Sequence, residues 1–326
     1  MTNSGRIKFV HELKKGRIYS MKYDIKQIPC QRKDNGKKLY LRRFQCESSY
    51  EDKNILCIHG LTLTQHVFDI DYKDYSVARW FCKQGYTVWL LDIGGYGFSE
   101  EYENGWDCTT ENAAKDIITA AEVINETQHT TQINLMGWSW GSMTTSKAAG
   151  MRPDLFRRLV LIAPVTGGGP KPRVSVTEPK AWITLPGIAR LFRHTLSGGD
   201  EVSTIDNPIE GDEIDYTTAD RFVVALEFQE AFTHDCAHPR PEAGTKECLD
   251  NPPDAWLIDG TKIKCPTIMV RGTDDVYTTP ELYEKLLQQL PEGSEKHTFK
   301  GAGHGLYYEM DYYQRFRELV YKFLEK

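Results

Sequence analysis

The chain has 326 residues, of which 40% are hydrophobic and 26% charged, and its formal net charge is −6. A chain of this length buries about three quarters of its extended surface, so it can build a large core without disulfide or metal staples. The small acidic excess provides no overall positive charge for nucleic acid, and we expect no nucleic-acid partner.

The N-terminal residues 1–20 carry five Lys and Arg among isolated apolar residues and lack the apolar run of a secretory signal. No stretch reaches the roughly 18 apolar residues that a membrane span needs. The eight cysteines are scattered without the short spacings of a disulfide framework, so we expect reduced thiols. These features predict a cytoplasmic protein, and they leave its oligomeric state open.

Strand-like and helix-like segments follow one another along the chain. Residues 17–43 alternate polar and apolar side chains around an Asp34-Asn35-Gly36 turn, which predicts one or two antiparallel strands at a sheet edge. Further strands are expected at 54–59, 86–93, 132–136, 159–165, 267–271 and 296–299. Helices are expected at 75–83, 111–126 with Thr110 as its N-cap, 143–149, 280–290 and 312–323. Alternation of this kind predicts an α/β fold with a mostly parallel central sheet and helices on both faces.

An insertion interrupts this pattern. The strand and helix rhythm stops after Val165, so we predict a core of residues 1–167 and 263–326 and an inserted helical cap, or lid, of residues 168–262. Apolar residues at helical spacing predict two cap helices, near 182–192 and 222–232. Residues 198–260 hold 16 Asp/Glu and 3 Lys/Arg, whereas residues 1–50 hold 4 and 13. The acidic charge of the chain is therefore concentrated in the predicted cap.

The strongest chemical signal is the sequence Gly137-Trp138-Ser139-Trp140-Gly141, which matches the pattern G-x-S-x-G. We expect a buried strand to end at the first glycine and a helix to start after the second, which is the context of a nucleophile elbow. The serine then occupies a strained turn, and a side chain at either glycine would clash with its neighbours. Ser139 is therefore the predicted nucleophile.

A serine hydroxyl needs a base that is held in the correct tautomer by an acid. The loop Gly272-Thr273-Asp274-Asp275 follows a predicted strand, and Gly301-Ala302-Gly303-His304-Gly305 follows the last one. We assign His304 as the base. We favour Asp275 over Asp274 as the acid, because the carboxylate usually stands three residues after the glycine, and Asp274 stays the alternative.

Acyl transfer also needs two N–H donors for the developing oxyanion. The backbone N–H of Trp140, directly after the nucleophile, is the first candidate, and that of Leu61 in the loop His59-Gly60-Leu61-Thr62 is the second. Gly60 would keep this loop close to the substrate, and Trp138 is a candidate for lining the substrate pocket. We interpret His59 as a structural hydrogen-bonding residue.

With these motifs in this order, the chain resembles the α/β-hydrolase superfamily over nearly all of residues 50–326. The segment Asp92-Ile93-Gly94-Gly95-Tyr96-Gly97-Phe98-Ser99 is similar to the D-x-x-G-x-G-x-S loop of that superfamily. The resemblance implies an α/β-hydrolase fold with a Ser-Asp-His triad and no cofactor. A serine at the nucleophile position disfavours the related haloalkane dehalogenases and epoxide hydrolases, which carry an aspartate there.

Two resemblances within the superfamily point to different substrates. The loop His59-Gly60-Leu61-Thr62, followed by Phe68, resembles the oxyanion loop of lipases and carboxylesterases. The elbow Ser139-Trp140-Gly141-Ser142 resembles that of proline iminopeptidases, whose caps hold a substrate ammonium with carboxylates. Those peptidases carry His-Gly-Gly-Pro-Gly at the oxyanion loop, and this chain departs from that pattern at Leu61.

The sequence therefore predicts a serine hydrolase, a carboxylic ester hydrolase in type, that cleaves an ester, thioester or lactone of a small to medium, partly apolar acyl substrate. The alternatives are an aminopeptidase of the proline-iminopeptidase type, an acyltransferase or cyclase with the same triad, and a non-catalytic ligand receptor. No metal is expected, because His234-Asp235-Cys236-Ala237-His238 with Cys248 matches no zinc spacing.

Overall fold

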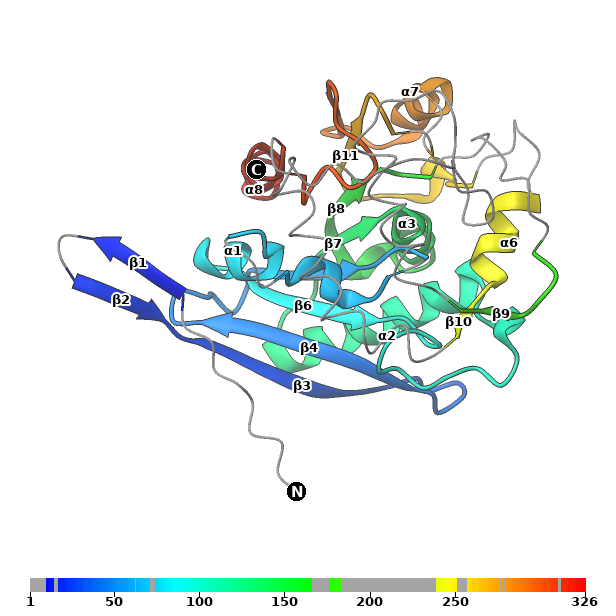
Figure 1. Cartoon of the computed structure of the whole chain (residues 1–326), viewed down its shortest axis with the longest axis horizontal. Helices are drawn as coiled ribbons and strands as arrows, with labels where there is room; N and C mark the ends of the chain where they lie inside the picture. The colour runs from blue at the N-terminus through cyan, green and yellow to red at the C-terminus, as the bar shows by residue number, and fades with distance from the viewer. Residues whose placement is uncertain are drawn as a thin grey trace, which may run out of the picture.

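A computed structural model describes residues 10–14, 17–61, 63–70, 74–165, 176–182, 239–250, 257–275, 277, 280–309 and 312–326. The described chain is built around a sheet of eight strands in the order β12-β11-β8-β7-β5-β6-β4-β3 (Figure 1). The strands of this sheet are β3 (Tyr23–Gln31), β4 (Lys38–Cys46), β5 (Asn54–Ile58), β6 (Thr87–Asp92), β7 (Ile133–Trp138), β8 (Phe156–Ile162), β11 (Thr267–Gly272) and β12 (Glu295–Phe299).

The sheet is mostly parallel, as predicted. All pairs from β12 to β6 are parallel, whereas β4 pairs antiparallel with both β6 and β3. The β3-β4 hairpin forms one edge of the sheet, and its turn contains Gly36 with a φ of +73°. A shorter antiparallel hairpin, β1 (Val10–Lys14) with β2 (Arg17–Met21), precedes it. The predicted antiparallel edge is thus confirmed.

Helices cover both faces of the sheet (Figure 1). One apolar cluster joins Ile55 and Cys57 of β5 to α1 (Val77–Lys83) and α8 (Tyr313–Leu324). The other joins Leu56 and Ile58 of the same strand to α2 (Thr110–Gln128), α3 (Trp140–Met151) and α7 (Pro280–Gln289). Successive side chains of a strand point to opposite faces, and burial of apolar surface on both sides stabilises this three-layer arrangement.

Two predicted boundaries are wrong. The N-cap of α2 is Thr109, whose side chain accepts a hydrogen bond from the Asn112 N–H at 3.1 Å, and Thr110 is the first helical residue. At the elbow, β7 continues to Trp138 and α3 begins at Trp140, so a single residue separates strand and helix. The helix α3 is buried over most of its surface, and it therefore lacks the apolar stripe that marks a helix start in sequence.

Within the predicted cap, the structure describes four short elements, of which one is the 3-10 segment η4 (Gly260–Lys262). Strands β9 (Lys180–Ala181) and β10 (Arg240–Pro241) pair antiparallel, and α6 (Ala243–Asp250) follows directly. The predicted cap helices near 182–192 and 222–232 and the cluster at 234–238 lie outside the described residues, Trp182 excepted. The domain boundaries remain a prediction.

Four short 3-10 segments complete the described elements: η1 (Gln65–Phe68), η2 (Gly105–Asp107), η3 (Pro153–Leu155) and η4 (Gly260–Lys262). Among the helices described, none combines the length and the apolar character that crossing a lipid bilayer requires.

Candidate active site

Ser139 lies in the sharp turn between β7 and α3, at the carboxyl edge of the sheet. Its φ and ψ are 58° and −123°, a region that residues with a Cβ rarely occupy. Its backbone N–H donates to the Ile162 carbonyl at 2.9 Å, which fixes the turn to β8. The side chain makes no capping hydrogen bond to α3 and is partly exposed. The strained backbone therefore fixes the position of the Ser139 side chain, and its hydroxyl does not cap the helix.

The close approach of β5 explains the second glycine of the motif. A Cβ on Gly141 would lie 2.5 Å from both the Ile58 and the His59 carbonyl oxygens. These oxygens belong to backbone, which cannot rotate away as a flexible side chain can. The glycine thus lets the start of α3 pack directly against the end of β5 and brings the 59–61 loop next to Ser139.

The predicted acid and base form a contact. His304 Nδ1 lies 3.0 Å from Asp275 Oδ1, and both side chains are largely buried, with exposures of 9% and 0%. Asp275 follows β11 and His304 follows β12, which are neighbouring parallel strands. An ionised carboxylate accepts only, so Nδ1 carries the proton in this pair and Nε2 of the neutral ring is left with a free lone pair.

The side chain of Asp274, the alternative acid, contacts Thr273. Asp274 Oδ1 accepts a hydrogen bond from the Thr273 hydroxyl at 2.7 Å, and its backbone N–H donates to the Ala302 carbonyl at 3.0 Å. Asp275 Oδ1 instead accepts the backbone N–H of Tyr277 at 2.9 Å in addition to facing His304. The geometry therefore favours Asp275 as the partner of His304.

Trp138, the residue before Ser139, contacts His304. Its indole Nε1 donates to the His304 carbonyl oxygen at 2.8 Å, and the two ring centroids are 5.5 Å apart. The ring of Tyr277 packs edge-on against His304 at 4.8 Å. The sequence contained no signal for Tyr277, and it pointed to Trp138 only through its place beside the serine.

The candidate oxyanion residues lie beside Ser139. A Cβ on Gly60 would be 3.1 Å from Cβ of Ser139, so the 59–61 backbone passes directly over the serine. A Cβ on Gly244 would meet Leu61 Cδ2 at 2.6 Å and Trp140 Cε2 at 2.7 Å, which places Leu61 and Trp140 next to each other. Trp140 is the first residue of α3, where backbone N–H groups have no partner within the helix. Both predicted donors are thus close to Ser139.

His59 has a structural position in the same loop. Its Nε2 accepts the Ile93 N–H at 3.1 Å, so Nδ1 carries the proton and donates to the Gly60 carbonyl at 2.7 Å. Complete burial lowers the pKa of His59 to about 4. The neutral ring links the oxyanion loop to the segment after β6.

This arrangement predicts a specific acid sensitivity. Above about pH 6.5, His59 is neutral in both the folded and the unfolded chain, and its contribution to stability is complete. Between pH 6.5 and about 4 the unfolded chain binds a proton that the folded chain does not, so stability falls as the pH falls. The expected loss is about 3 kcal/mol, from roughly 1.4 kcal/mol per pKa unit.

Urea unfolding at a series of pH values from 7.5 to 4, for the wild-type protein and His59→Gln, measures this effect. The variant is expected to be less stable at neutral pH but to lose about 3 kcal/mol less on acidification. Parallel stability curves for the two proteins would contradict the assignment of a neutral His59.

The D-x-x-G-x-G-x-S segment is hydrogen-bonded to the segment that follows the 59–61 loop. Asp92 is fully buried, and its carboxylate accepts the backbone N–H groups of Gln65 at 2.9 Å and Phe98 at 3.1 Å. Burial raises the pKa of Asp92 to about 6, although these N–H donors oppose the shift. The Ser99 hydroxyl donates to the Asp92 carbonyl, which closes the loop. The motif therefore joins the segments after β5 and β6.

Helix α6 of the predicted cap packs against the start of α3. Glu247 Oε2 accepts the Thr110 N–H at 2.9 Å, and the Thr110 hydroxyl in turn accepts the Trp140 indole N–H at 3.0 Å. Cys248 Sγ lies 3.7 Å from Met143 Sδ. The indole of Trp140 is consequently fully buried, between core and cap.

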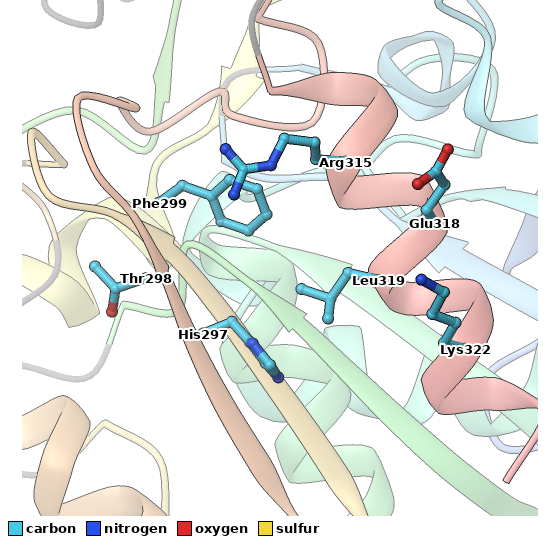
Figure 2. A pocket seen from close by; sticks show the side chains of 7 residues that line it. All are labelled: His297, Thr298, Phe299, Arg315, Glu318, Leu319 and Lys322. Carbon is cyan, nitrogen blue, oxygen red and sulfur yellow. The ribbon is translucent and has the colours of Figure 1, made fainter.

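A cavity of about 300 Å³ lies elsewhere, between β12 and α8 (Figure 2). It is lined by His297, Thr298, Phe299, Arg315, Glu318, Leu319 and Lys322. The Arg315 guanidinium lies over the Phe299 ring at 5.1 Å, as Figure 2 shows. None of the lining residues belongs to the predicted site, so this cavity is separate from Ser139.

Comparison with known proteins identifies the family and the fold. A family model described as serine aminopeptidase, S33, matches residues 51–311. The structure is similar to an esterase from Exiguobacterium antarcticum, with a TM-score of 0.60 and 17% identity over 92% of this chain and 100% of that one. It is also similar to the enol-lactonase of Burkholderia xenovorans LB400, with a TM-score of 0.60 and 20% identity over 90% and 98% of the two chains. At these identities the likeness shows the fold.

One curated sequence match is to a much longer protein. The polyketide synthase ThaQ of Burkholderia thailandensis is 25% identical over 196 residues, which are 59% of this chain and 8% of that protein. The chain thus corresponds to a small part of the synthase.

Proposed function

Since the chain belongs to the serine aminopeptidase S33 family and has the α/β-hydrolase fold, we propose that it is a serine hydrolase acting on esters or on related thioesters or lactones. The proposed substrate is small to medium in size and partly apolar. The observation that carries the proposal is the strained Ser139 turn together with the buried Asp275-His304 contact, which the hydrogen bond from Trp138 to the His304 carbonyl links to the elbow. Such a constellation is suited to acyl transfer.

In the proposed first half-reaction, Ser139 Oγ attacks the substrate carbonyl carbon while Nε2 of His304 takes the hydroxyl proton. The backbone N–H groups of Leu61 and Trp140 stabilise the negative charge that develops on the carbonyl oxygen. The bond to the leaving group then breaks, and the imidazolium of His304 gives its proton to the departing oxygen or sulfur. An acyl-enzyme on Ser139 remains.

Water completes the reaction. His304 accepts a proton from water as the water oxygen attacks the acyl carbonyl, and collapse of the second tetrahedral intermediate releases the acid and restores the Ser139 hydroxyl. Asp275 stays ionised throughout and stabilises the charged ring. The proposed chemistry uses only protein groups and water.

The principal alternative is an aminopeptidase. The description of the matching family and the 16 acidic residues between 198 and 260 favour it, because carboxylates can hold a substrate ammonium. Four of these acids make contacts in the described part of the chain: Glu242 with Arg240 at 2.7 Å, Glu247 with Thr110, Asp250 with Lys246, and Asp259 with Lys262 at 3.2 Å. An acyltransferase or cyclase would use the same triad with an alcohol or amine in place of water, and exclusion of water by the cap would decide between them.

Substrate preference tests the ester proposal. We expect p-nitrophenyl esters, assayed over a range of acyl chain lengths, to give a larger kcat/KM than aminoacyl p-nitroanilides, with Ser139→Ala as the blank for uncatalysed hydrolysis. A preference for the anilides that is lost when acidic residues of 198–260 are neutralised would replace the esterase by the aminopeptidase. Ser139-independent turnover of both series would reject both.

A further inference from the structure

His304 lies in the loop that follows β12, outside any helix or strand. Loops of this kind hold a side chain less firmly than a strand does, unless hydrogen bonds fix their backbone. Two sets of hydrogen bonds fix part of the backbone of this loop. The Gly303 N–H donates to both carboxylate oxygens of Glu309 at 3.1 Å, and the Asp274 N–H donates to the Ala302 carbonyl. These bonds join the loop to itself and to the loop of the acid. They do not relate the base to the nucleophile.

A hydrogen bond from Trp138 relates His304 to Ser139. The indole N–H donates to the carbonyl of His304 itself at 2.8 Å, from a residue that is 166 positions away in sequence and adjacent to Ser139. Trp138 ends β7, its neighbours Met136 and Gly137 pair with β5 and β8, and its side chain is only 4% exposed. A residue fixed in the centre of the sheet therefore holds the peptide of the base.

The surroundings restrict the indole to this orientation. Its ring packs against Tyr307 at 5.5 Å and Tyr308 at 5.8 Å, both edge-on, besides the contact with His304. Tyr307 in turn stacks on Phe68 at 5.4 Å, next to the oxyanion loop. Edge-on and offset contacts of this kind are the preferred aromatic geometries, and they leave little rotational freedom. The aromatic packing aims the N–H at the His304 carbonyl.

We propose that Trp138 is a positioning residue, which sets the location of His304 relative to Ser139 through this hydrogen bond. The proposal rests on the proposed serine hydrolase function and adds to it the device that holds the base beside the nucleophile. A displacement of about 1 Å in a catalytic group can lower the rate about 100-fold. A residue that instead contacted the substrate would act on KM and on chain-length preference.

Trp138→Phe tests the proposal, because it keeps an aromatic ring and removes the donor. We expect kcat for the best p-nitrophenyl ester to fall about 10- to 100-fold, with KM within about threefold of the wild type. The matched control is Trp89→Phe: the Trp89 indole N–H also makes a buried hydrogen bond, to Asn54 Oδ1 at 2.9 Å, but it lies in β6 away from the site. Both variants are expected to lose a similar amount of thermal stability, and the control keeps its kcat.

A second readout is independent of turnover. In the wild type, the Nδ1 proton shared by His304 and Asp275 is expected to give a downfield proton NMR signal, assigned by its loss in His304→Gln. Trp138→Phe should broaden or shift this signal, whereas Trp89→Phe should leave it in place. If the wild type proved inactive towards every ester and anilide, the proposed function would fail, and this signal would still decide whether Trp138 positions His304.

A third protein guards against a folding defect in Trp138→Phe. Incorporation of benzothienylalanine at position 138 keeps the bicyclic shape and replaces the N–H by sulfur. The proposal predicts that this protein also loses kcat and the sharp Nδ1 signal. Wild-type kcat and an unchanged NMR signal in either folded position-138 variant, or a loss confined to KM, would overturn it.

Discussion

Replacing Asp275 with asparagine is expected to lower kcat about 10⁴-fold, the size of the loss when a triad carboxylate becomes an amide. Asp275 Oδ1 contacts both the Tyr277 N–H and His304 Nδ1. With its oxygen at this position, the asparagine amide accepts from both groups but lacks the negative charge that stabilises the imidazolium. In the reversed orientation, its NH₂ group faces His304 Nδ1. The amide donates where the carboxylate accepted, so it favours the tautomer with the proton on Nε2. In that tautomer His304 cannot take the proton of Ser139.

The matched control for this substitution is the adjacent residue. Asp274→Asn makes the same chemical change in the same loop, at a side chain that bonds Thr273 and not His304, and we expect its kcat to stay within about threefold of the wild type. Steady-state kinetics with one p-nitrophenyl ester, together with thermal unfolding of both variants, make the comparison. Equal losses of kcat in two folded proteins would refute the choice of Asp275.

Ser139→Ala is expected to have the largest effect, a loss of about 10⁶-fold in kcat, because without the hydroxyl no acyl-enzyme can form. The substitution should leave stability nearly unchanged: the Ser139 side chain does not cap α3, and alanine meets the same steric limit at a φ of 58°. Burst kinetics and thermal unfolding report on the two expectations separately. A folded Ser139→Ala protein that keeps more than about one thousandth of the wild-type kcat would indicate a different nucleophile.

The sequence predicted the sheet well because its strands are short apolar runs separated by clear helices and turns. The boundaries at the elbow were less accessible. Helix α3 starts with Trp140, Gly141 and Ser142, which are weak helix formers, and its burial on most sides removes the apolar periodicity. The first turn of α3 is determined by its tertiary packing against β5. In the sequence, the only sign of this packing is that residue 141 is glycine.

The common location of the candidate site residues was predictable for a related reason. Ser139, Asp275 and His304 each follow a strand in a recognisable local pattern, and parallel strands bring those positions to one edge. The local sequence pattern does not predict the contacts between the loops. The bond from Trp138 to His304 and the contact of Tyr277 with the same ring join segments that are distant in sequence or have no motif, so they emerge only from the folded chain.

The central claim is that Ser139 is an activated nucleophile, and labelling with a fluorophosphonate tests it most directly. The wild-type protein is expected to form one covalent adduct, located on Ser139 by peptide mass spectrometry, and the folded Ser139→Ala protein is expected to form none. The absence of an adduct in folded wild-type protein, or equal labelling of both proteins, would contradict the account.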